Sequence, residues 1–233
     1  MARARLTTIP KERFLDRQEA GKLLGERLQV YRGQDVIVLG IPRGGLPVAA
    51  EVAEMLDAEL DVVVARKLGA PGYTELAIGA ITANGGIFLN EDMIRDLNVR
   101  PAYLKSVTQQ ESAEAAARES RFRRGRPSPP LTGRTVIVVD DGLATGATMR
   151  AALRSVAKQH PAKLVAAVPV GSDQGCEALL ETCDEVLCLL HPDPFYAVGL
   201  YYEHFEPTPD RVVEALPQEA HDRRAAPSPQ TAG

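Results

Sequence analysis

The chain has 233 residues, of which 45% are hydrophobic and 25% charged, and its formal net charge is −4. This composition is typical of a globular protein, and the weakly acidic charge excludes the global basic field on which bulk nucleic-acid binding depends. No stretch approaches the ~18 apolar residues that a membrane-spanning helix needs, and the N-terminus lacks the apolar segment of a signal peptide. We therefore expect a cytoplasmic protein with neither nucleic acid nor a membrane as its partner.

The N-terminal part of the chain predicts helices and strands in alternation. Residues 1–13 lack hydrophobic periodicity and are expected to form a loose arm. Asp16 and Glu19 resemble a capping box, which marks the start of the first helix. After the arm we predict a helix over 16–30, a strand over 35–39, a helix over 47–56 and a strand over 60–65.

Two loops that follow predicted strands carry positive charge. In the first, Gly44 and Gly45 leave backbone N–H groups free to point outward, and Arg43 offers a forked donor suited to phosphate oxygens. The second begins with Arg66 and Lys67. Its continuation, residues 68–75, contains Gly and Pro and is interpreted as a mobile lid over an anionic ligand. An ordinary glycine turn and a solvated basic turn remain the alternatives.

The segment 76–126 is predicted to be an α+β appendage inserted into the sheet domain. Asn84-Gly85 predicts a hairpin between strands 76–82 and 86–90. A short helix over 91–97 and a long one over 101–124 follow, and the long helix ends in a basic cluster. We interpret this cluster as a solvated helix face, with RNA contact as the less favoured alternative. Its members are Arg118, Arg121, Arg123, Arg124 and Arg126.

Residues 135–149, TVIVVDDGLATGATM, form the most informative segment of the chain. A buried strand over 135–139 precedes two adjacent carboxylates, Asp140 and Asp141, and a turn of small residues leads into an amphipathic helix. Backbone N–H groups at a helix start attract phosphate, and Thr145 and Thr148 add hydroxyl donors. The carboxylates can accept hydrogen bonds from vicinal sugar hydroxyls and help to hold a divalent cation.

The C-terminal part continues the alternation with strands over 163–170 and 185–190 and a helix over 172–180 between them. This pattern predicts a doubly wound, mainly parallel α/β sheet built from residues 14–75 and 131–216. Residues 217–233 are expected to be a disordered tail. The odd number of cysteines favours buried thiols over a disulfide framework or a metal site; these are Cys176, Cys183 and Cys188.

Aromatic residues gather in the segment 191–205. At the edge of a phosphate site, aromatic faces such as that of Tyr196 are what a planar base would stack on. An edge strand that closes the core with these aromatics is the alternative.

The order acid-acid-x-x-x-Thr-Gly-x-Thr after a hydrophobic strand resembles the PRPP-binding loop of the type I phosphoribosyltransferases. A Walker A motif would need a Lys after Gly146, and a dinucleotide fingerprint would place its acid after the glycines. The resemblance implies that the 5-phosphate of PRPP binds at Ala144, Thr145, Gly146, Ala147 and Thr148. It also implies that pyrophosphate binds at Arg43, Gly44, Gly45, Arg66 and Lys67.

The resemblance further implies an Mg²⁺-dependent transfer of the 5-phosphoribosyl group of PRPP to a nitrogenous base, with release of pyrophosphate. Asp140 and Asp141 would hold the ribose and the metal, and Arg66 and Lys67 would complete the catalytic group. The spacing of the last aromatic segment is similar to the base-binding tail of the hypoxanthine/guanine enzymes, which implies base contacts from Tyr196, Val198 and Glu203. The predicted partners are PRPP and a nucleobase-like molecule, and the predicted assembly is a homodimer.

One position departs from the family pattern. Ala144 stands where the 6-oxopurine enzymes usually carry an Asp near the purine N7, and the adenine enzymes are more similar here. The aromatic segment 191–205 is instead more similar to the hypoxanthine/guanine enzymes, so the resemblance does not decide which base is the acceptor. The alternative function is a regulatory protein that senses PRPP or a nucleotide without turnover. Ala144 and the basic helix end favour the sensor, and the intact pyrophosphate side favours the enzyme.

Overall fold

The computed structural model describes residues 3–6 and 11–225. At its centre lies a six-stranded sheet in which neighbouring strands pair in parallel. Because the middle strands are continuous apolar runs, both faces of the sheet need cover. Across the sheet the order is β1 (Arg3–Leu6), β9 (Glu185–Leu190), β8 (Lys163–Val170), β7 (Thr135–Val139), β2 (Val36–Gly40) and β3 (Glu59–Val62).

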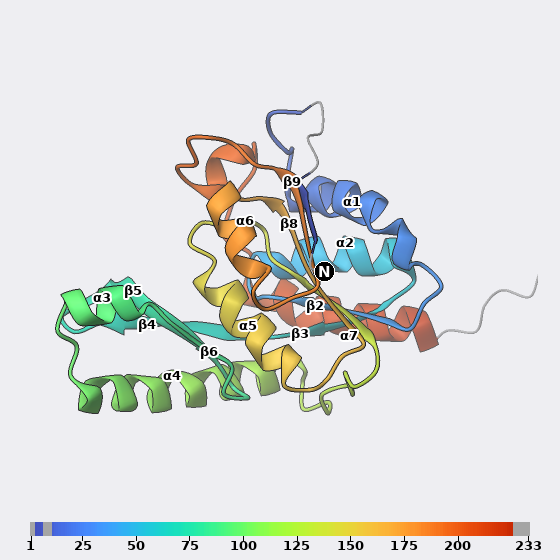
Figure 1. Cartoon of the computed structure of the whole chain (residues 1–233). Helices are drawn as coiled ribbons and strands as arrows, with labels where there is room; N and C mark the ends of the chain where they lie inside the picture. The colour runs from blue at the N-terminus through green and yellow to red at the C-terminus, as the bar shows by residue number, and fades with distance from the viewer. Residues whose placement is uncertain (1–2, 7–10, 226–233) are drawn as a thin grey trace, which may run out of the picture.

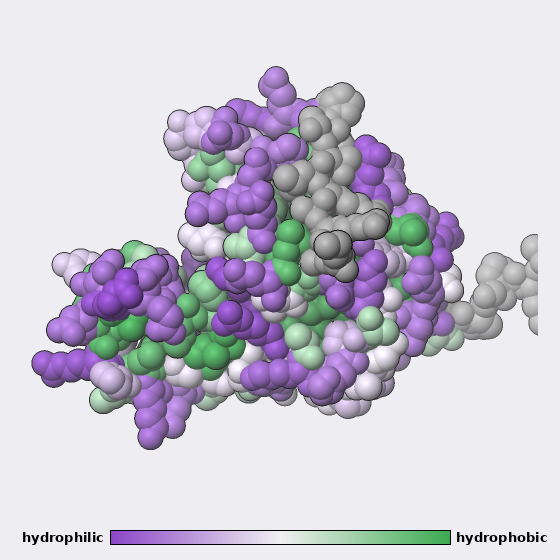
Figure 2. Space-filling model, in the orientation of Figure 1, coloured by the Kyte–Doolittle hydropathy of each residue, from purple (hydrophilic) through white to green (hydrophobic). Residues whose placement is uncertain are grey.

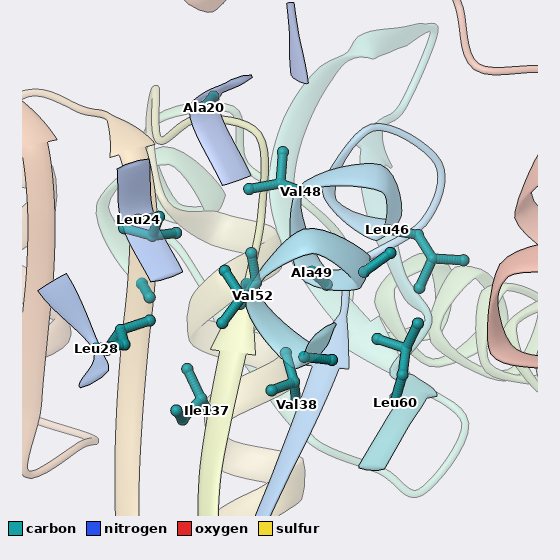
Figure 3. Close-up of a cluster of buried hydrophobic side chains, with 14 of the residues drawn as sticks. Ala20, Leu24, Leu28, Val38, Leu46, Val48, Ala49, Val52, Leu60 and Ile137 are labelled. Carbon is teal, nitrogen blue, oxygen red and sulfur yellow. The ribbon is translucent and has the colours of Figure 1, made fainter. Parts of the chain in front are cut away.

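Helices cover the two faces of this sheet, which confirms the predicted doubly wound α/β fold (Figure 1). One face carries α1 (Arg17–Arg27), α2 (Gly45–Leu56) and α7 (Asp210–Ala225), and the other carries α5 (Ala147–Ala157) and α6 (Asp173–Leu179). Side chains alternate between the faces along β2 and β7: Val38 and Ile137 pack under α1 and α2 (Figure 3), and Ile37 and Val136 pack under α5. None of the described helices is long and apolar enough to cross a membrane.

The appendage is a three-stranded antiparallel sheet with two helices, and it projects from the sheet domain (Figure 1). Its own small core contains Leu68, Ile78 and Ile81, against which the helices pack. The predicted Asn84-Gly85 hairpin is confirmed, and the Asn90 side chain caps the helix that begins at Glu91 by accepting from the Met93 N–H. The elements are β4 (Ala65–Ala70), β5 (Tyr73–Thr82), β6 (Ile87–Leu89), α3 (Glu91–Asp96) and α4 (Pro101–Phe122).

The appendage begins earlier than the predicted boundary at residue 76. Arg66 and Lys67 lie on β4, which pairs antiparallel with β5, so residues 68–75 form the tip of a hairpin and not a free lid. The physical reason is local: Pro71-Gly72 makes a tight turn, with Gly72 at φ 76°, and the strands on either side continue the pairing.

The appendage also packs against α5. Arg150 lies over the Phe88 ring, with 4.2 Å from its guanidinium carbon to the ring centroid, and Arg154 Nη1 donates to the Ile87 carbonyl at 2.9 Å. Ala80 of β5 forms an apolar cluster with two alanines of α5. Figure 2 shows hydrophobic residues on the appendage beside α5, inside a mainly hydrophilic surface.

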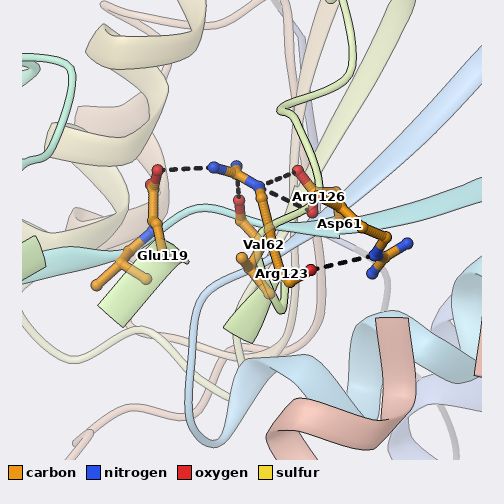
Figure 4. A network of polar contacts seen from close by, with 6 residues as sticks. Asp61, Val62, Glu119, Arg123 and Arg126 are labelled. Atoms are coloured by element: carbon orange, nitrogen blue, oxygen red, sulfur yellow. Dashed lines mark hydrogen bonds and ion pairs between the residues drawn. The ribbon is translucent and has the colours of Figure 1, made fainter. Parts of the chain in front are cut away.

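A buried ion-pair network joins the end of α4 to the sheet domain (Figure 4). Arg123 Nε donates to Asp61 Oδ2 at 2.8 Å, Arg123 Nη1 donates to Glu119 Oε2 at 2.9 Å, and Glu119 Oε1 accepts from the Val64 N–H. Burial raises the pKa of Asp61, and Arg123 opposes that rise. The interpretation of the basic cluster as a solvated face is therefore wrong for Arg123, which is buried and pairs with Asp61, 62 residues earlier in the chain.

The two chain ends also depart from the predictions. Arg3–Leu6 forms the edge strand β1 through backbone pairing with β9, which needs no hydrophobic periodicity, so the loose arm is wrong there. Residues 217–225 are the second half of α7 and not a disordered tail, because Val213, Pro217 and Ala220 line one buried face. Residues 226–233 of the predicted tail and 7–10 of the predicted arm lie outside the described residues.

Candidate functional site

The two carboxylates Asp140 and Asp141 stand at the carboxyl end of β7, in contact with the loop that follows β2. A Cβ atom on Gly44 would lie 1.9 Å from Asp141 Oδ2, so a side chain there would displace the Asp141 carboxylate. The backbone of the loop Pro42-Arg43-Gly44-Gly45 therefore lies directly against the acid pair. In open α/β sheets, ligands bind at this edge, outside the carboxyl ends of the strands.

Arg17 is a site residue that the sequence interpretation missed. Its Nε donates to Asp141 Oδ2 at 2.9 Å, and its guanidinium carbon lies 4.0 Å from the centroid of the Phe205 ring. The Tyr202 hydroxyl donates to the Asp141 backbone carbonyl at 2.6 Å. Arg17 is the first residue of α1 and lies 124 positions before Asp141 in the chain, so no local sequence pattern predicts their contact.

The electrostatics of the acid pair favour a ligand that compensates negative charge. Burial, followed by the neighbouring charge of Asp141, raises the pKa of Asp140 well above its ordinary value. Burial also raises the pKa of Asp141, and the Arg17 guanidinium opposes this shift. Two ionised carboxylates side by side are costly without a partner, so hydroxyl donors or a cation stabilise them.

Replacing Asp140 with asparagine should stabilise the folded protein at neutral pH. A carboxyl whose pKa is raised on folding binds its proton more readily when folded, so its ionisation destabilises the protein as the pH rises. The variant should therefore unfold at a higher temperature than the wild type near neutral pH. This gain should shrink as the pH falls toward 3.8, the ordinary Asp value. Thermal unfolding across this pH range measures the gain. Asp92→Asn, at an exposed position, is the control, and its unfolding temperature should differ little from that of the wild type at any pH in the range.

The loop after the acid pair leads directly into α5. Leu143 is buried and its N–H donates to the Val170 carbonyl at 2.8 Å, which fixes the loop against β8. Gly146 caps α5 with a φ of 72°, and Ala144 and Thr145 are exposed just before it. The start of α5 thus presents N–H groups and a threonine hydroxyl beside a tight glycine turn. This arrangement suits a phosphate group.

A cleft of about 560 Å³ lies between the sheet domain and the appendage. It brings together all three cations predicted to bind pyrophosphate, namely Arg43, Arg66 and Lys67, and Thr148 also lines it. From the other side α4 contributes polar and aromatic side chains. These are Tyr103, Ser106, Gln110, Glu111 and Arg118. A cleft of this size and positive charge suits a polyanionic ligand.

The three residues predicted to bind the base lie apart from this cleft. A Cβ atom on Gly142 would lie 2.4 Å from Val198 Cγ1, so Val198 packs directly on the loop after the acid pair. The Tyr196 side chain is 74% exposed, and Glu203 is exposed next to the buried Tyr202. The segment 191–205 contains the short 3₁₀ helix Val198–Tyr201 and not the alternative edge strand.

The carboxylate oxygens of the acid pair suit a divalent cation whose coordination shell is completed by a bound ligand. Asp140 Oδ1 accepts from the Asp141 N–H and Asp141 Oδ2 accepts from Arg17, which leaves one further carboxylate oxygen on each residue. Within residues 3–6 and 11–225, no group of three or more His, Cys, Asp or Glu side chains could hold a metal. Mg²⁺ commonly binds through one or two carboxylates together with substrate phosphates and water, which matches this pair.

Comparisons with known proteins agree with these observations. The model of the phosphoribosyl transferase domain matches residues 12–203. Proteins from two Mycobacterium tuberculosis strains, CDC 1551 and H37Rv, carry provisional phosphoribosyl transferase names and are 48% identical over 209 residues. That alignment covers 89% of this chain and 47% of theirs, so the chain spans about half the length of these curated relatives. The crystal structure of TT1426 from Thermus thermophilus is 44% identical, with a TM-score of 0.75, and the match covers 89% of this chain and 98% of that one.

Proposed function

The chain belongs to the phosphoribosyl transferase domain family, and from that premise we propose that it transfers the 5-phosphoribosyl group of PRPP to a nitrogenous base and releases pyrophosphate. One observation carries the proposal: the acid pair, the start of α5 and the cationic cleft adjoin one another at one edge of the sheet. They offer partners for the ribose hydroxyls, the 5-phosphate and the pyrophosphate of a single ligand.

Each proposed contact follows from the chemistry of the groups. Asp140 and Asp141 accept hydrogen bonds from the ribose hydroxyls, and the N–H groups before α5, with Thr145 and Thr148, donate to the 5-phosphate. Arg43, Arg66 and Lys67 neutralise the pyrophosphate as it leaves. We propose Mg²⁺ as the cofactor, which when bound supplies further neutralisation of the pyrophosphate.

The reaction exchanges one bond at the anomeric carbon of the ribose for another. The bond from this carbon to the pyrophosphate oxygen breaks, and a bond to a nitrogen of the base forms as that nitrogen loses its proton to the departing pyrophosphate or to water. Displacements at such a carbon pass through an oxocarbenium-like transition state, so the enzyme must hold the ribose and exclude water. No protein nucleophile is required.

The acceptor base is proposed to lie beside Val198, with Tyr196 and Glu203 as neighbouring contacts. Val198 supports this placement because it packs on the loop that follows the acid pair. Ala144 has no group that could move a proton at the base, so the identity of the acceptor is a matter for direct assay.

Thermal unfolding with PRPP and Mg²⁺ tests whether the site binds this ligand. A ligand at ~100 times its dissociation constant adds roughly 2.7 kcal/mol to the free energy of unfolding. For a chain of this length that predicts a rise in the unfolding midpoint of about 5–10 °C. The rise should depend on Mg²⁺ and disappear in Asp141→Asn. An unchanged midpoint at millimolar PRPP would contradict the proposed ligand.

Ala144 also favours a second function, in which the protein senses PRPP or a nucleotide without turnover. Incubation of the protein with PRPP and a panel of bases distinguishes the two functions. Release of pyrophosphate with any base identifies an enzyme, whereas binding of PRPP without release across the panel supports the sensor.

A further inference from the structure

Three charged groups of the proposed site are paired with counter-ions from elements outside its loops. Asp141 pairs with Arg17 of α1, and Arg43 Nη1 lies 3.5 Å from Asp210 Oδ1 of α7. Arg66 Nε lies 2.7 Å from Glu111 Oε2 of α4. The proposed ligand needs these same charges, so the protein already holds partners that compete with it.

The Arg66–Glu111 pair is the one in which both side chains line the cleft. The Arg66 side chain is 29% exposed and that of Glu111 16%, so the pair is sheltered but open to a ligand. The Tyr103 hydroxyl donates to the Gly69 carbonyl at 2.9 Å, which fastens α4 to the strand that carries Arg66. The fold therefore places the Glu111 carboxylate beside the Arg66 guanidinium.

We propose that Glu111 is an exchangeable counter-ion that competes with pyrophosphate for Arg66. The inference rests on the proposed function, which makes Arg66 a contact of the departing pyrophosphate. An anion that reaches the Arg66 guanidinium enters the cleft that also holds the Glu111 carboxylate, and the two like charges repel. Glu111 must give up its contact as the anion binds.

This exchange has a role in the proposed reaction. A site that neutralises pyrophosphate strongly would also retain it as a product, and product release often limits turnover. Competition from Glu111 lowers the affinity of the cleft for pyrophosphate, so that the product leaves. The appendage therefore takes part in the site through α4 as well as through Arg66 and Lys67 of β4, although no residue of α4 belongs to a ligand-binding motif of the sequence.

Titration calorimetry of the full chain with inorganic pyrophosphate and Mg²⁺ tests the inference. Glu111→Gln keeps the size of the side chain and removes its charge, and it should bind pyrophosphate about fivefold more tightly than the wild type, since a partly exposed ion pair is worth up to about 1 kcal/mol. Glu91→Gln removes the same charge from an exposed position of the appendage outside the cleft lining, and its affinity should change less than about twofold because solvent and salt screen it.

The possible outcomes separate this inference from the proposed function. Equal binding by Glu111→Gln would overturn the inference, and weaker binding would overturn it and identify Glu111 as a residue that positions Arg66 for the ligand. An equal gain in affinity for Glu91→Gln would also overturn it, because the effect would then come from the overall charge of the protein and not from the Arg66–Glu111 contact. If the wild type binds pyrophosphate and Glu111→Gln binds no tighter, the proposed function stands without the exchange. If neither protein binds pyrophosphate, both proposals fail.

Discussion

Asp141→Asn should lower the rate of pyrophosphate release from PRPP by about 10²- to 10³-fold, the usual effect of removing one preorganised group that stabilises a transition state. The amide cannot accept hydrogen bonds from the ribose hydroxyls as a carboxylate does, and it cannot balance the positive charge that develops on the sugar ring. Steady-state assays of pyrophosphate release, with the base that the panel identifies, measure the effect.

Two controls separate a loss of chemistry from a loss of structure. Asp92→Asn removes an exposed carboxylate that pairs with Arg95 on α3, and it should leave turnover unchanged. Because Asp141→Asn leaves Arg17 without its carboxylate, the unfolding midpoint of the variant is measured as well. A folded Asp141→Asn protein with wild-type turnover would remove Asp141 from the proposed site.

Arg123→Met should lower the free energy of unfolding by about 3–5 kcal/mol, because it removes one member of a buried ion-pair network and leaves the others uncompensated. Asp61 and Glu119 would remain buried as carboxylates, and the Val62 carbonyl would lose the N–H that it accepts at 2.8 Å. For a chain of this length the unfolding midpoint should fall by roughly 6–20 °C. Urea unfolding and calorimetry measure the two quantities.

Arg118→Met is the matched control on the same helix. Arg118 pairs with Glu114 one turn away at 2.8 Å, but both side chains are more than two-fifths exposed. An exposed pair of this kind contributes about 0.3–0.5 kcal/mol, so the control should unfold almost as the wild type does. Similar losses in the two variants would mean that the buried network contributes little to stability.

The sheet domain could be predicted because its signals are local. An apolar run such as residues 135–139 forms a strand buried on both faces, and Ser172 caps α6 because its side chain accepts from the Gly175 N–H. The acid pair and the loop before α5 follow from the same rule, since a strand, a turn of small residues and a helix determine their own geometry. The motif itself lies within one short stretch of the chain.

The missed features depend on partners far away in the sequence. Arg123 and Arg124 are neighbours in one basic run, yet Arg123 is buried and Arg124 is exposed, because Asp61 lies 62 residues before Arg123 and meets it only in the fold. The pairing of Arg17 with Asp141 has the same origin. Sequence composition cannot tell a solvated arginine from one that is held by a distant carboxylate.

Helix α5 packs against both the parallel sheet and the appendage, and this affects how the protein unfolds. This helix buries one side against the parallel sheet and turns Ala147 and Ala151 toward Ala80 of the appendage. Loss of the appendage would expose those alanines and uncover Arg150 and Arg154, which now lie over Phe88. The segment is an insertion in the order of the chain, but α5 packs against both parts, so we expect the appendage and the sheet domain to unfold as one cooperative unit.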